Sequence, residues 1–216
     1  MTVYGIWTLR LAGVVVALVL WFWTQRWLGR RPAGRGGIGD AIHDWTRSAH
    51  GYLLIHTHAA NALLVCSSLG IDLVGLMLLG LGVFGSTVRP LLGLFLVFGL
   101  RQASQAICAL PPPPGMIWRH PGWPSLLVTY GVANDLFFSG HTAIAVLGAV
   151  ELCSSGSVAL GVLGVGLAVF EAVSVLLLRA HYTMDVMAGA AVALLVGRWA
   201  AAWAPACDSF LSGLLH

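Results

Sequence analysis

The fold is decided by residues 158–178, which read VALGVLGVGLAVFEAVSVLLL. A single residue in this stretch, Glu171, is charged, and a helix that crosses a bilayer needs about 20 predominantly apolar residues. Moving outward in both directions, five further apolar runs meet the same condition. The six expected spans are 7–28, 58–84, 88–110, 137–154, 157–178 and 183–204. The sequence therefore predicts an all-α polytopic membrane protein, a six-transmembrane-helix bundle, with residues 1–216 forming a single transmembrane domain.

The composition excludes a soluble globular domain. Hydrophobic residues make up 58% of the chain and charged residues 9%, with a mean hydropathy of +0.88. The 27 glycines suit the close helix packing found in lipid. All basic residues are arginines and the net charge is only +3, so we expect no nucleic-acid partner. The four cysteines lack a CxxC spacing and are expected to be small core residues.

Two polar stretches separate the apolar runs. The stretch 30–52 lies between the first two spans and contains DAIHDW at residues 40–45, a pattern typical of an interfacial helix. The stretch PPPPG at residues 111–115 must end the third span, because proline lacks an amide donor and clashes with the preceding turn.

The span count brings two distant histidines together. His141 begins the fourth span and His181 directly precedes the sixth, so the two crossings between them return the chain to its starting side. The polar stretches 30–52 and 111–136 open on that side as well. We therefore expect one membrane face to gather most of the histidine, arginine and aspartate side chains.

The segment DLFFSGHT, residues 135–142, places Ser-Gly-His-Thr at the start of a helix. Free backbone N–H groups and the helix dipole attract anions at such a position, which favours a phosphate cradle. The alternative is a plain serine N-cap followed by an incidental histidine.

The segment HYTMD, residues 181–185, separates His181 and Asp185 by four positions. This spacing brings two side chains onto one face of a helix. A carboxylate held against one imidazole nitrogen fixes the tautomer and leaves the other nitrogen available as a nucleophile or base. Ionisable groups in a membrane are costly unless they function, so the pair favours chemistry.

Together the two segments resemble the catalytic motifs of the type 2 phosphatidate phosphatase superfamily, and they are most similar to its sphingomyelin synthase branch. That branch carries Gly-Asp-x-x-x-Ser-Gly-His-Thr, which residues 134–142 follow with Asn134 in place of Gly. It also carries an arginine in the third span followed by Leu-Pro-x-Pro-Gly, which Arg101 and residues 110–115 resemble with an extra proline. Residues 40–44 resemble a further motif ahead of the second span.

The resemblance implies a lipid phosphotransferase. It would move a phosphocholine- or phosphoethanolamine-type headgroup from a glycerophospholipid to a ceramide- or diacylglycerol-like alcohol through a phosphohistidine intermediate. His181 would attack phosphorus, Asp185 would orient it, and His141 would protonate the departing alkoxide and then activate the acceptor. Membrane lipids are the expected partners, and no metal or other cofactor is required.

Seven further residues are expected to bind the substrate: Asp135, Ser139, Gly140, Arg101, Arg119, Arg179 and His43. The phosphatase branch usually carries Lys-x6-Arg-Pro and a separate Ser-Arg ahead of the final histidine. Here Arg89-Pro90 has no matching lysine, and only Arg179 lies near His181. We therefore expect Arg119 and Arg179 to neutralise the phosphate.

Arg101 and Glu171 lie at matching depths, each about ten residues or roughly 15 Å of helix from the polar end of its span. We expect Arg101 to pair with Glu171, or else with Asp72 or Glu151, because an unpaired charge at that depth is unfavourable. Whether such a pair is purely structural or serves the substrate stays open.

The other polar and aromatic clusters favour simpler interpretations. His56 and His58 point apart on a helix, and no carboxylate or thiolate spacing completes a metal site around them. Trp118 and Trp123 lie in a loop that could hold a choline group, although tryptophans near span ends are typically interfacial anchors.

Two other functions use overlapping features. A lipid phosphate phosphatase, or a phospholipase C-like hydrolase, would use the same residues with water as the acceptor. A transporter or channel would instead spread polar residues along the depth of several helices, whereas this sequence concentrates them at one face.

Two indications of sidedness conflict. The arginines on the histidine side outnumber those on the other side, which by the positive-inside rule favours a cytoplasmic site. The family resemblance implies a lumenal or periplasmic site, and we follow the resemblance, because some of these arginines could serve anionic headgroups.

Overall fold

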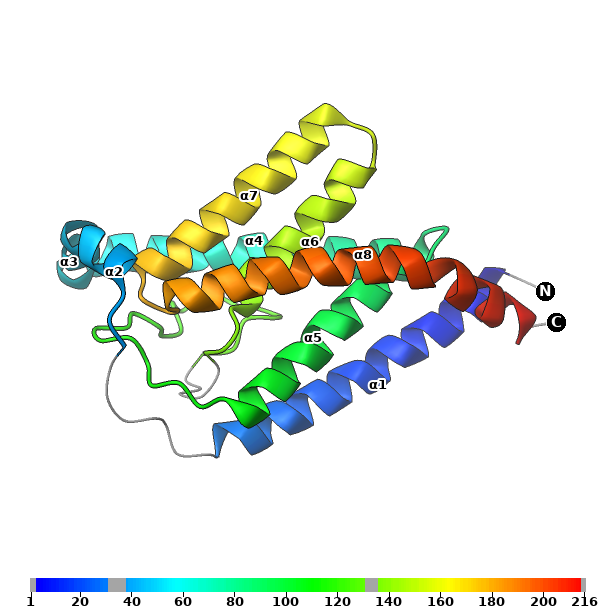
Figure 1. Cartoon of the computed structure of the whole chain (residues 1–216), viewed down its shortest axis with the longest axis horizontal. Coiled ribbons are helices and arrows are strands. Elements are labelled where there is room, and N and C mark those ends of the chain that lie inside the picture. The colour runs from blue at the N-terminus through cyan, green and yellow to red at the C-terminus, as the bar shows by residue number, and fades with distance from the viewer. Residues whose placement is uncertain (1–2, 31–37, 131–135, 215–216) are drawn as a thin grey trace.

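The structure, a computed structural model, describes residues 3–30, 38–130 and 136–214. Within these ranges the chain forms helices and no strand (Figure 1). The helices are α1 (Val3–Gly29), α2 (Ala41–Trp45), α3 (Arg47–Ile55), α4 (Thr57–Phe84), α5 (Arg89–Ile107), α6 (Gly140–Ser154), α7 (Val158–Leu177) and α8 (Thr183–Gly213). The all-α prediction is therefore confirmed for the described residues.

Five of the described helices, α1, α4, α5, α7 and α8, are long and apolar enough to cross a membrane. The helix α6 is also apolar but has only 15 residues, fewer than the about 20 that a straight spanning helix needs. The predicted count of six spans is therefore not confirmed. The described residues contain five candidate spans and one shorter apolar helix.

The outward faces of these helices are apolar. Val19 of α1, Leu73 of α4, Val162 of α7 and Leu194 of α8 are all more than half exposed. Contiguous exposed apolar surface of this extent is unfavourable in water, whereas lipid tails solvate it. The five helices and their apolar exterior fit a multi-pass membrane protein.

The helices α6 and α7 form an antiparallel hairpin (Figure 1). Gly156 adopts a φ of 79° in the connecting turn, and the Ser157 side chain caps α7 by accepting the Leu160 N–H. The two helices approach each other closely at Gly164, which has no side chain. A Cβ at this position would lie only 2.9 Å from the Ala149 Cα. The hairpin returns the chain, so the residues before α6 and after α7 lie on the same side of its turn.

The helix α6 packs between α4, α5 and α8 and carries the centre of the core. Leu147 of α6 is fully buried against Leu78 of α4, Val97 of α5 and Val196 of α8. The first turn of α6, which contains His141, is therefore held inside the bundle rather than at its rim.

Several helix ends differ from the predicted ones. The helix α5 ends at Ile107, ahead of the prolines 111–114 that were predicted to stop it. The helix α6 begins at Gly140, three residues later than expected, and α8 continues through Pro205 to Gly213. The helices α2 and α3 occupy the stretch where one interfacial helix was expected, and their location at a membrane interface stays a prediction.

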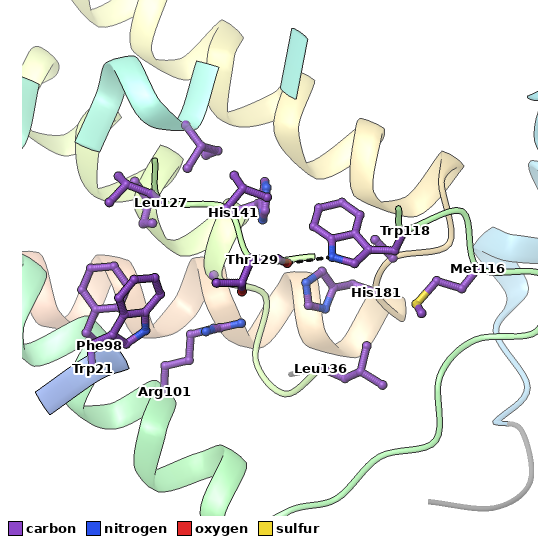
Figure 2. Close-up of a pocket in the computed structure, with 15 residues that line it drawn as sticks. Trp21, Phe98, Arg101, Met116, Trp118, Leu127, Thr129, Leu136, His141 and His181 are labelled. Atoms are coloured by element: carbon purple, nitrogen blue, oxygen red, sulfur yellow. Dashed lines mark hydrogen bonds between the residues drawn. The ribbon is translucent and has the colours of Figure 1, made fainter. Parts of the chain in front are cut away.

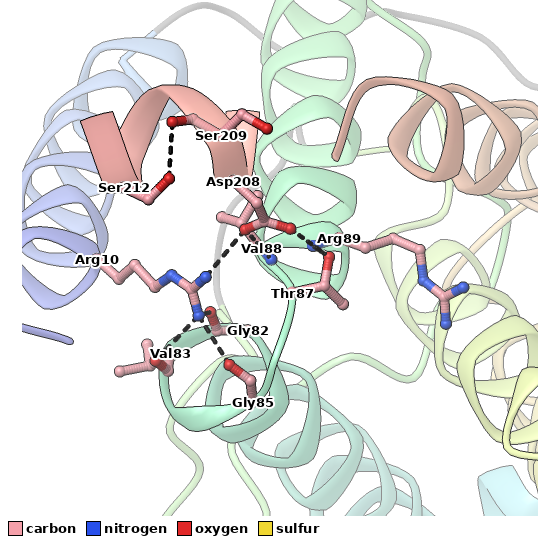
Figure 3. A network of polar contacts seen from close by, with 10 residues as sticks. All are labelled: Arg10, Gly82, Val83, Gly85, Thr87, Val88, Arg89, Asp208, Ser209 and Ser212. Atoms are coloured by element: carbon pink, nitrogen blue, oxygen red, sulfur yellow. Dashed lines mark hydrogen bonds and ion pairs between the residues drawn. The ribbon is translucent and has the colours of Figure 1, made fainter. Parts of the chain in front are cut away.

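A polar network connects the helices at the end of the bundle where α1 begins and α8 ends (Figure 3). Arg10 of α1 is buried and pairs with Asp208 of α8 at 2.9 Å, and it also donates to the Gly85 carbonyl oxygen at 2.9 Å. Asp208 accepts from the Thr87 hydroxyl at 2.7 Å and from the Val88 N–H at 2.9 Å. The ion pair thus joins α1 to α8, and the hydrogen bonds around it join both helices to the connection between α4 and α5.

Candidate active site

The Ser139–Thr142 segment forms a tight corner at the start of α6. The Ser139 side chain accepts the Thr142 N–H at 3.3 Å and the Thr142 hydroxyl at 3.1 Å. Serine is favoured at this position because it satisfies one of the amide donors that a helix start leaves unpaired. The N-cap and phosphate-cradle interpretations are compatible, since the serine stabilises the turn that carries Gly140 and His141.

This corner is joined directly to the segment that contains His181 and Asp185. The Ser139 N–H donates to the Asp185 carbonyl oxygen at 3.0 Å. One turn further along α8, a Cβ on Gly189 would lie 2.6 Å from the Ser139 carbonyl oxygen, so only glycine permits this contact. The two motifs, distant in sequence, therefore meet, as the expected return of the chain between them predicted.

Asp185 lies in the first turn of α8 behind His181. Its Oδ2 accepts the Tyr182 N–H at 2.9 Å and lies 3.7 Å from His181 Nδ1, an ion-pair distance that is too long for a hydrogen bond. The spacing predicted that the two residues share one face of a helix, but His181 precedes α8, which begins at Thr183. The turn that caps α8 brings them together instead. Both side chains are buried, and their interaction is weakly screened.

One buried pocket, here called the histidine pocket, is lined by His141, His181, Arg101 and Gly140 (Figure 2). Within the described part of the chain, His141 Nε2 and His181 Nδ1 form no hydrogen bond. Buried polar atoms are normally paired. His181 Nδ1 faces Asp185, so it is the unpaired Nε2 of His141 that points to a site completed by a polar ligand.

Trp118 forms an aromatic wall of the histidine pocket. Its ring meets the His141 ring edge-on, with centroids 5.1 Å apart and planes at 84°. The indole N–H donates to the Thr129 carbonyl oxygen at 3.1 Å, and the Tyr130 ring packs at 5.0 Å. The loop between α5 and α6 thus contributes an apolar wall beside His141 that strengthens electrostatic interactions inside the pocket.

Arg101 supplies a positive charge to the histidine pocket. Its side chain is buried, and its Nε donates to the Phe138 carbonyl oxygen at 3.1 Å. A Cβ on Gly140 would lie 2.8 Å from Arg101 Nε and 3.1 Å from its Cζ. The glycine of the Ser-Gly-His-Thr segment is thus explained by the close approach of a guanidinium group to the start of α6.

The predicted ion pair between Arg101 and an intramembrane acid is not found among the described residues. Glu171, the first choice, accepts the Ser67 hydroxyl at 2.6 Å. Glu151 pairs instead with Arg89 at 2.5 Å. Matching depth along two helices did not identify the partner, because depth leaves the rotation of each helix undetermined.

Asp72, the remaining acid considered for Arg101, anchors the loop between α5 and α6. Its two carboxylate oxygens accept the Leu126 and Leu127 N–H groups at 2.9 Å each. Leu127 lines the histidine pocket, so Asp72 fixes part of the pocket wall from α4.

Asp40 and His43 contact the segment 181–183 from outside the pocket. Asp40 caps α2 by accepting the Ile42 N–H at 3.0 Å, and it also accepts the Thr183 N–H at 2.6 Å and its hydroxyl at 2.8 Å. Burial raises the pKa of the Asp40 carboxyl, but the hydrogen bonds from Thr183, together with the hydrogen bond and charge of His43, outweigh this effect and leave the pKa below its usual value. His43 Nε2 lies 3.0 Å from the His181 carbonyl oxygen, outside the pocket lining.

The two arginines expected to neutralise phosphate lie outside the lining of the histidine pocket. Arg179 adopts a φ of 52°, which is uncommon for a residue other than glycine. Its guanidinium donates to the carbonyl oxygens of Pro114 at 2.9 Å and His43 at 3.4 Å. Arg119 is exposed and donates to Asn61 at 2.9 Å. Their role in phosphate binding stays a prediction.

Some predicted features fall elsewhere or outside the described residues. Asp135 and Asn134 lie outside them. Trp123 is 61% exposed and does not line the histidine pocket, in contrast to Trp118. Across the described ranges, no group of three or more His, Cys, Asp or Glu side chains is arranged to hold a metal ion.

Two positioning carboxylates, Asp40 and Asp72, were not among the predicted site residues. An aspartate directly ahead of a short helix is an N-cap signal, which could have pointed to Asp40. No sequence signal marks the amides of a distant loop as partners of Asp72, because any backbone N–H can fill that role.

Residues 132–202 match the family model of the PAP2 superfamily C-terminal domain. This range contains both histidine segments together with α6 and α7. No significant match was found among curated proteins or among solved structures. Over these residues the chain is similar to the PAP2 superfamily, and the closer likeness to the sphingomyelin synthase branch rests on the sequence motifs.

Proposed function

We propose that this protein is a lipid phosphotransferase that moves a phosphocholine- or phosphoethanolamine-type headgroup from a glycerophospholipid to a ceramide- or diacylglycerol-like alcohol. The match of residues 132–202 to the PAP2 superfamily model suggests phosphatase- or phosphotransferase-type lipid activity. The observation that carries the proposal is the histidine pocket, in which two buried histidines, His141 with an unpaired Nε2 and His181 with Asp185 beside its Nδ1, lie next to Arg101.

In the first step His181 attacks phosphorus. Asp185 lies on the Nδ1 side of the ring, so Nδ1 carries the proton and Nε2 is left with the electron pair that forms the N–P bond. The bond from phosphorus to the glycerolipid oxygen breaks, and His141 gives a proton to that oxygen. The products are diacylglycerol and a phosphohistidine that retains the headgroup.

In the second step His141, now neutral, accepts the proton of the acceptor hydroxyl. The hydroxyl oxygen attacks phosphorus, the N–P bond breaks, and the electron pair returns to His181 Nε2. Arg101 stabilises the negative charge that the phosphate carries throughout, because its guanidinium lies beneath the first turn of α6. The start of α6 adds its own favourable field for an anion.

The headgroup would lie against Trp118, whose ring lines the histidine pocket. An indole face attracts a quaternary or primary ammonium group by cation–π interaction. This contact favours a phosphocholine or phosphoethanolamine headgroup over an uncharged one.

The product profile on defined lipids tests the proposal. Purified protein is incubated with headgroup-labelled phosphatidylcholine or phosphatidylethanolamine, with and without ceramide or diacylglycerol. Labelled sphingolipid or a newly labelled glycerolipid is the expected result. Release of free headgroup phosphate at the same rate with and without acceptor would instead identify a hydrolase that uses water.

The histidine pocket is further proposed to open on the lumenal or periplasmic side of the membrane. An impermeant thiol reagent applied to sealed cells should label a single cysteine placed at the exposed Arg47 next to α2, after the native cysteines are replaced. Labelling only after permeabilisation would assign the site to the cytoplasmic side.

A further inference from the structure

A second, apolar cavity lies between α1, α4 and α5. Its volume is about 290 Å³, at the lower end of the range for small-molecule sites. Its lining is apolar apart from Thr24 and Gln102. The cavity is large enough to accept part of a lipid.

The cavity adjoins the histidine pocket and shares part of its wall. Trp21 of α1, Phe98 of α5 and Leu127 of the loop between α5 and α6 line both spaces (Figure 2). A ligand that occupies one space therefore touches the wall of the other.

The polarity of the cavity changes along its length. Gln102 and Thr24 lie at the end next to Arg101, whereas Val14 and Leu94 line the other end. The helices α1 and α5 run in the same direction (Figure 1), and the path along α5 from Arg101 to Leu94 is roughly 10 Å. A phospholipid has the same gradient, from an anionic phosphate to an apolar chain.

The cavity also communicates with the exterior of the bundle. Leu20 lines the cavity and is 56% exposed on the apolar face of α1. Because lipid covers that face, a chain can enter sideways without crossing water.

We propose that this cavity binds an acyl chain of the lipid whose phosphate occupies the histidine pocket. The proposal rests on the proposed lipid phosphotransfer and adds to it the path of the donor lipid, with the phosphate at Arg101 and the chain between α1 and α5.

Replacing Gly99 with a larger residue would place a side chain inside the cavity. It lines the cavity, and a Cβ added to it meets nothing within 4 Å. Gly99→Leu also suits the helix, because leucine is a better helix former than glycine. We expect the ratio of kcat/KM for long-chain phosphatidylcholine to kcat/KM for chainless p-nitrophenyl phosphocholine to fall about tenfold or more, as hydrophobic pockets discriminate by steric fit.

Gly80→Leu is the matched control. Gly80 lies on α4, also has no neighbour within 4 Å of an added Cβ, and does not line the cavity. This variant should leave the ratio unchanged. An equal loss on both substrates in Gly99→Leu, or no loss on either, would overturn the assignment.

Photo-crosslinking separates this inference from the proposed function. A phosphatidylcholine with a diazirine near the end of one chain should label α1 and α5 near Val14 and Leu94 in the wild type, and less in Gly99→Leu. If the protein turns over no lipid, the proposed function fails, and the crosslink still decides the location of the chain. Labels confined to other helices would contradict the cavity assignment even in an active enzyme.

Discussion

The two histidines of the pocket differ in their surroundings. His181 has a carboxylate 3.7 Å from Nδ1, which favours one tautomer and stabilises the charge that develops when the ring attacks phosphorus. His141 meets the edge of Trp118, and its Nε2 has no hydrogen-bond partner in the described residues. The carboxylate beside His181 is the feature behind its proposed role as nucleophile, and the role of His141 in proton transfer stays a prediction.

Replacement of His141 tests this division of roles. His141→Ala should lower kcat on a natural phospholipid on the order of 10²–10⁴-fold, the usual contribution of a general acid. The loss should be much smaller for formation of the intermediate from p-nitrophenyl phosphocholine, whose leaving group needs no proton. Burst release of p-nitrophenol measures this step, and an equally large loss on both substrates would reject the acid role.

At the scale of elements, Asp40 links α2 to the start of α8. Its carboxylate accepts N–H groups from the first turn of each helix, and the adjacent His43 contacts the His181 backbone. The position of His181, the proposed nucleophile, thus depends on a short helix that lies outside the histidine pocket.

Asp40→Ala should reduce kcat roughly tenfold or more, because a small displacement of a reacting group is costly, while KM changes little. The lost N-cap should also lower stability by about 1 kcal/mol. Asp44→Ala is the control, since Asp44 is exposed and its contact with Arg47 lies on the surface. Steady-state kinetics of both variants measure the effect, and equal kinetics in both would remove Asp40 from the positioning of His181.

The sequence predicted the meeting of the two motifs but not how each is held. Two consecutive apolar runs between His141 and His181 were enough to predict that the residues meet, because the hairpin of α6 and α7 returns the chain, although the number of membrane crossings is not confirmed. The partner of Arg101 could not be predicted from depth, since Glu171 and Glu151 bind Ser67 and Arg89. Contacts of this kind depend on helix rotation, which an almost uniformly apolar sequence does not specify.

Helix ends were predicted less well than helix existence. The fourth apolar run was expected to begin at residue 137, but α6 begins at Gly140, after the N-cap Ser139. The spacing of His181 and Asp185 suggested a helix face, yet His181 precedes α8. In both cases a cap decides the boundary, and caps depend on local hydrogen bonds more than on hydropathy.

At the scale of the whole molecule, the two ends of the bundle have different tasks. The histidine pocket lies within the bundle next to α2 and the start of α8, while the Arg10–Asp208 network holds α1, α8 and the connection between α4 and α5 at the other end. We therefore expect catalysis and anchoring to be separated along the long axis of the molecule, with α2 and the start of α8 toward one end and the two termini at the other (Figure 1).

Asp208→Ala should lower the Tm in detergent by several degrees, because it leaves the buried Arg10 guanidinium without its carboxylate, a loss on the order of 3 kcal/mol for such pairs. The kcat should stay close to that of the wild type. Arg47→Ala, which removes an exposed ion pair, should shift the Tm hardly at all. Thermal unfolding and turnover measured on the same samples check both statements, and a matching fall in kcat would contradict the separation of tasks.

The central claim is that the phosphate is transferred through His181. The most direct measurement is rapid quenching of the wild type with phosphorus-labelled donor lipid in the absence of acceptor, followed by peptide mapping of the label. The account predicts an acid-labile, base-stable label on His181, discharged when a lipid alcohol is added and lost in a folded His181→Ala variant. Label on another residue, or full turnover by His181→Ala, would contradict it.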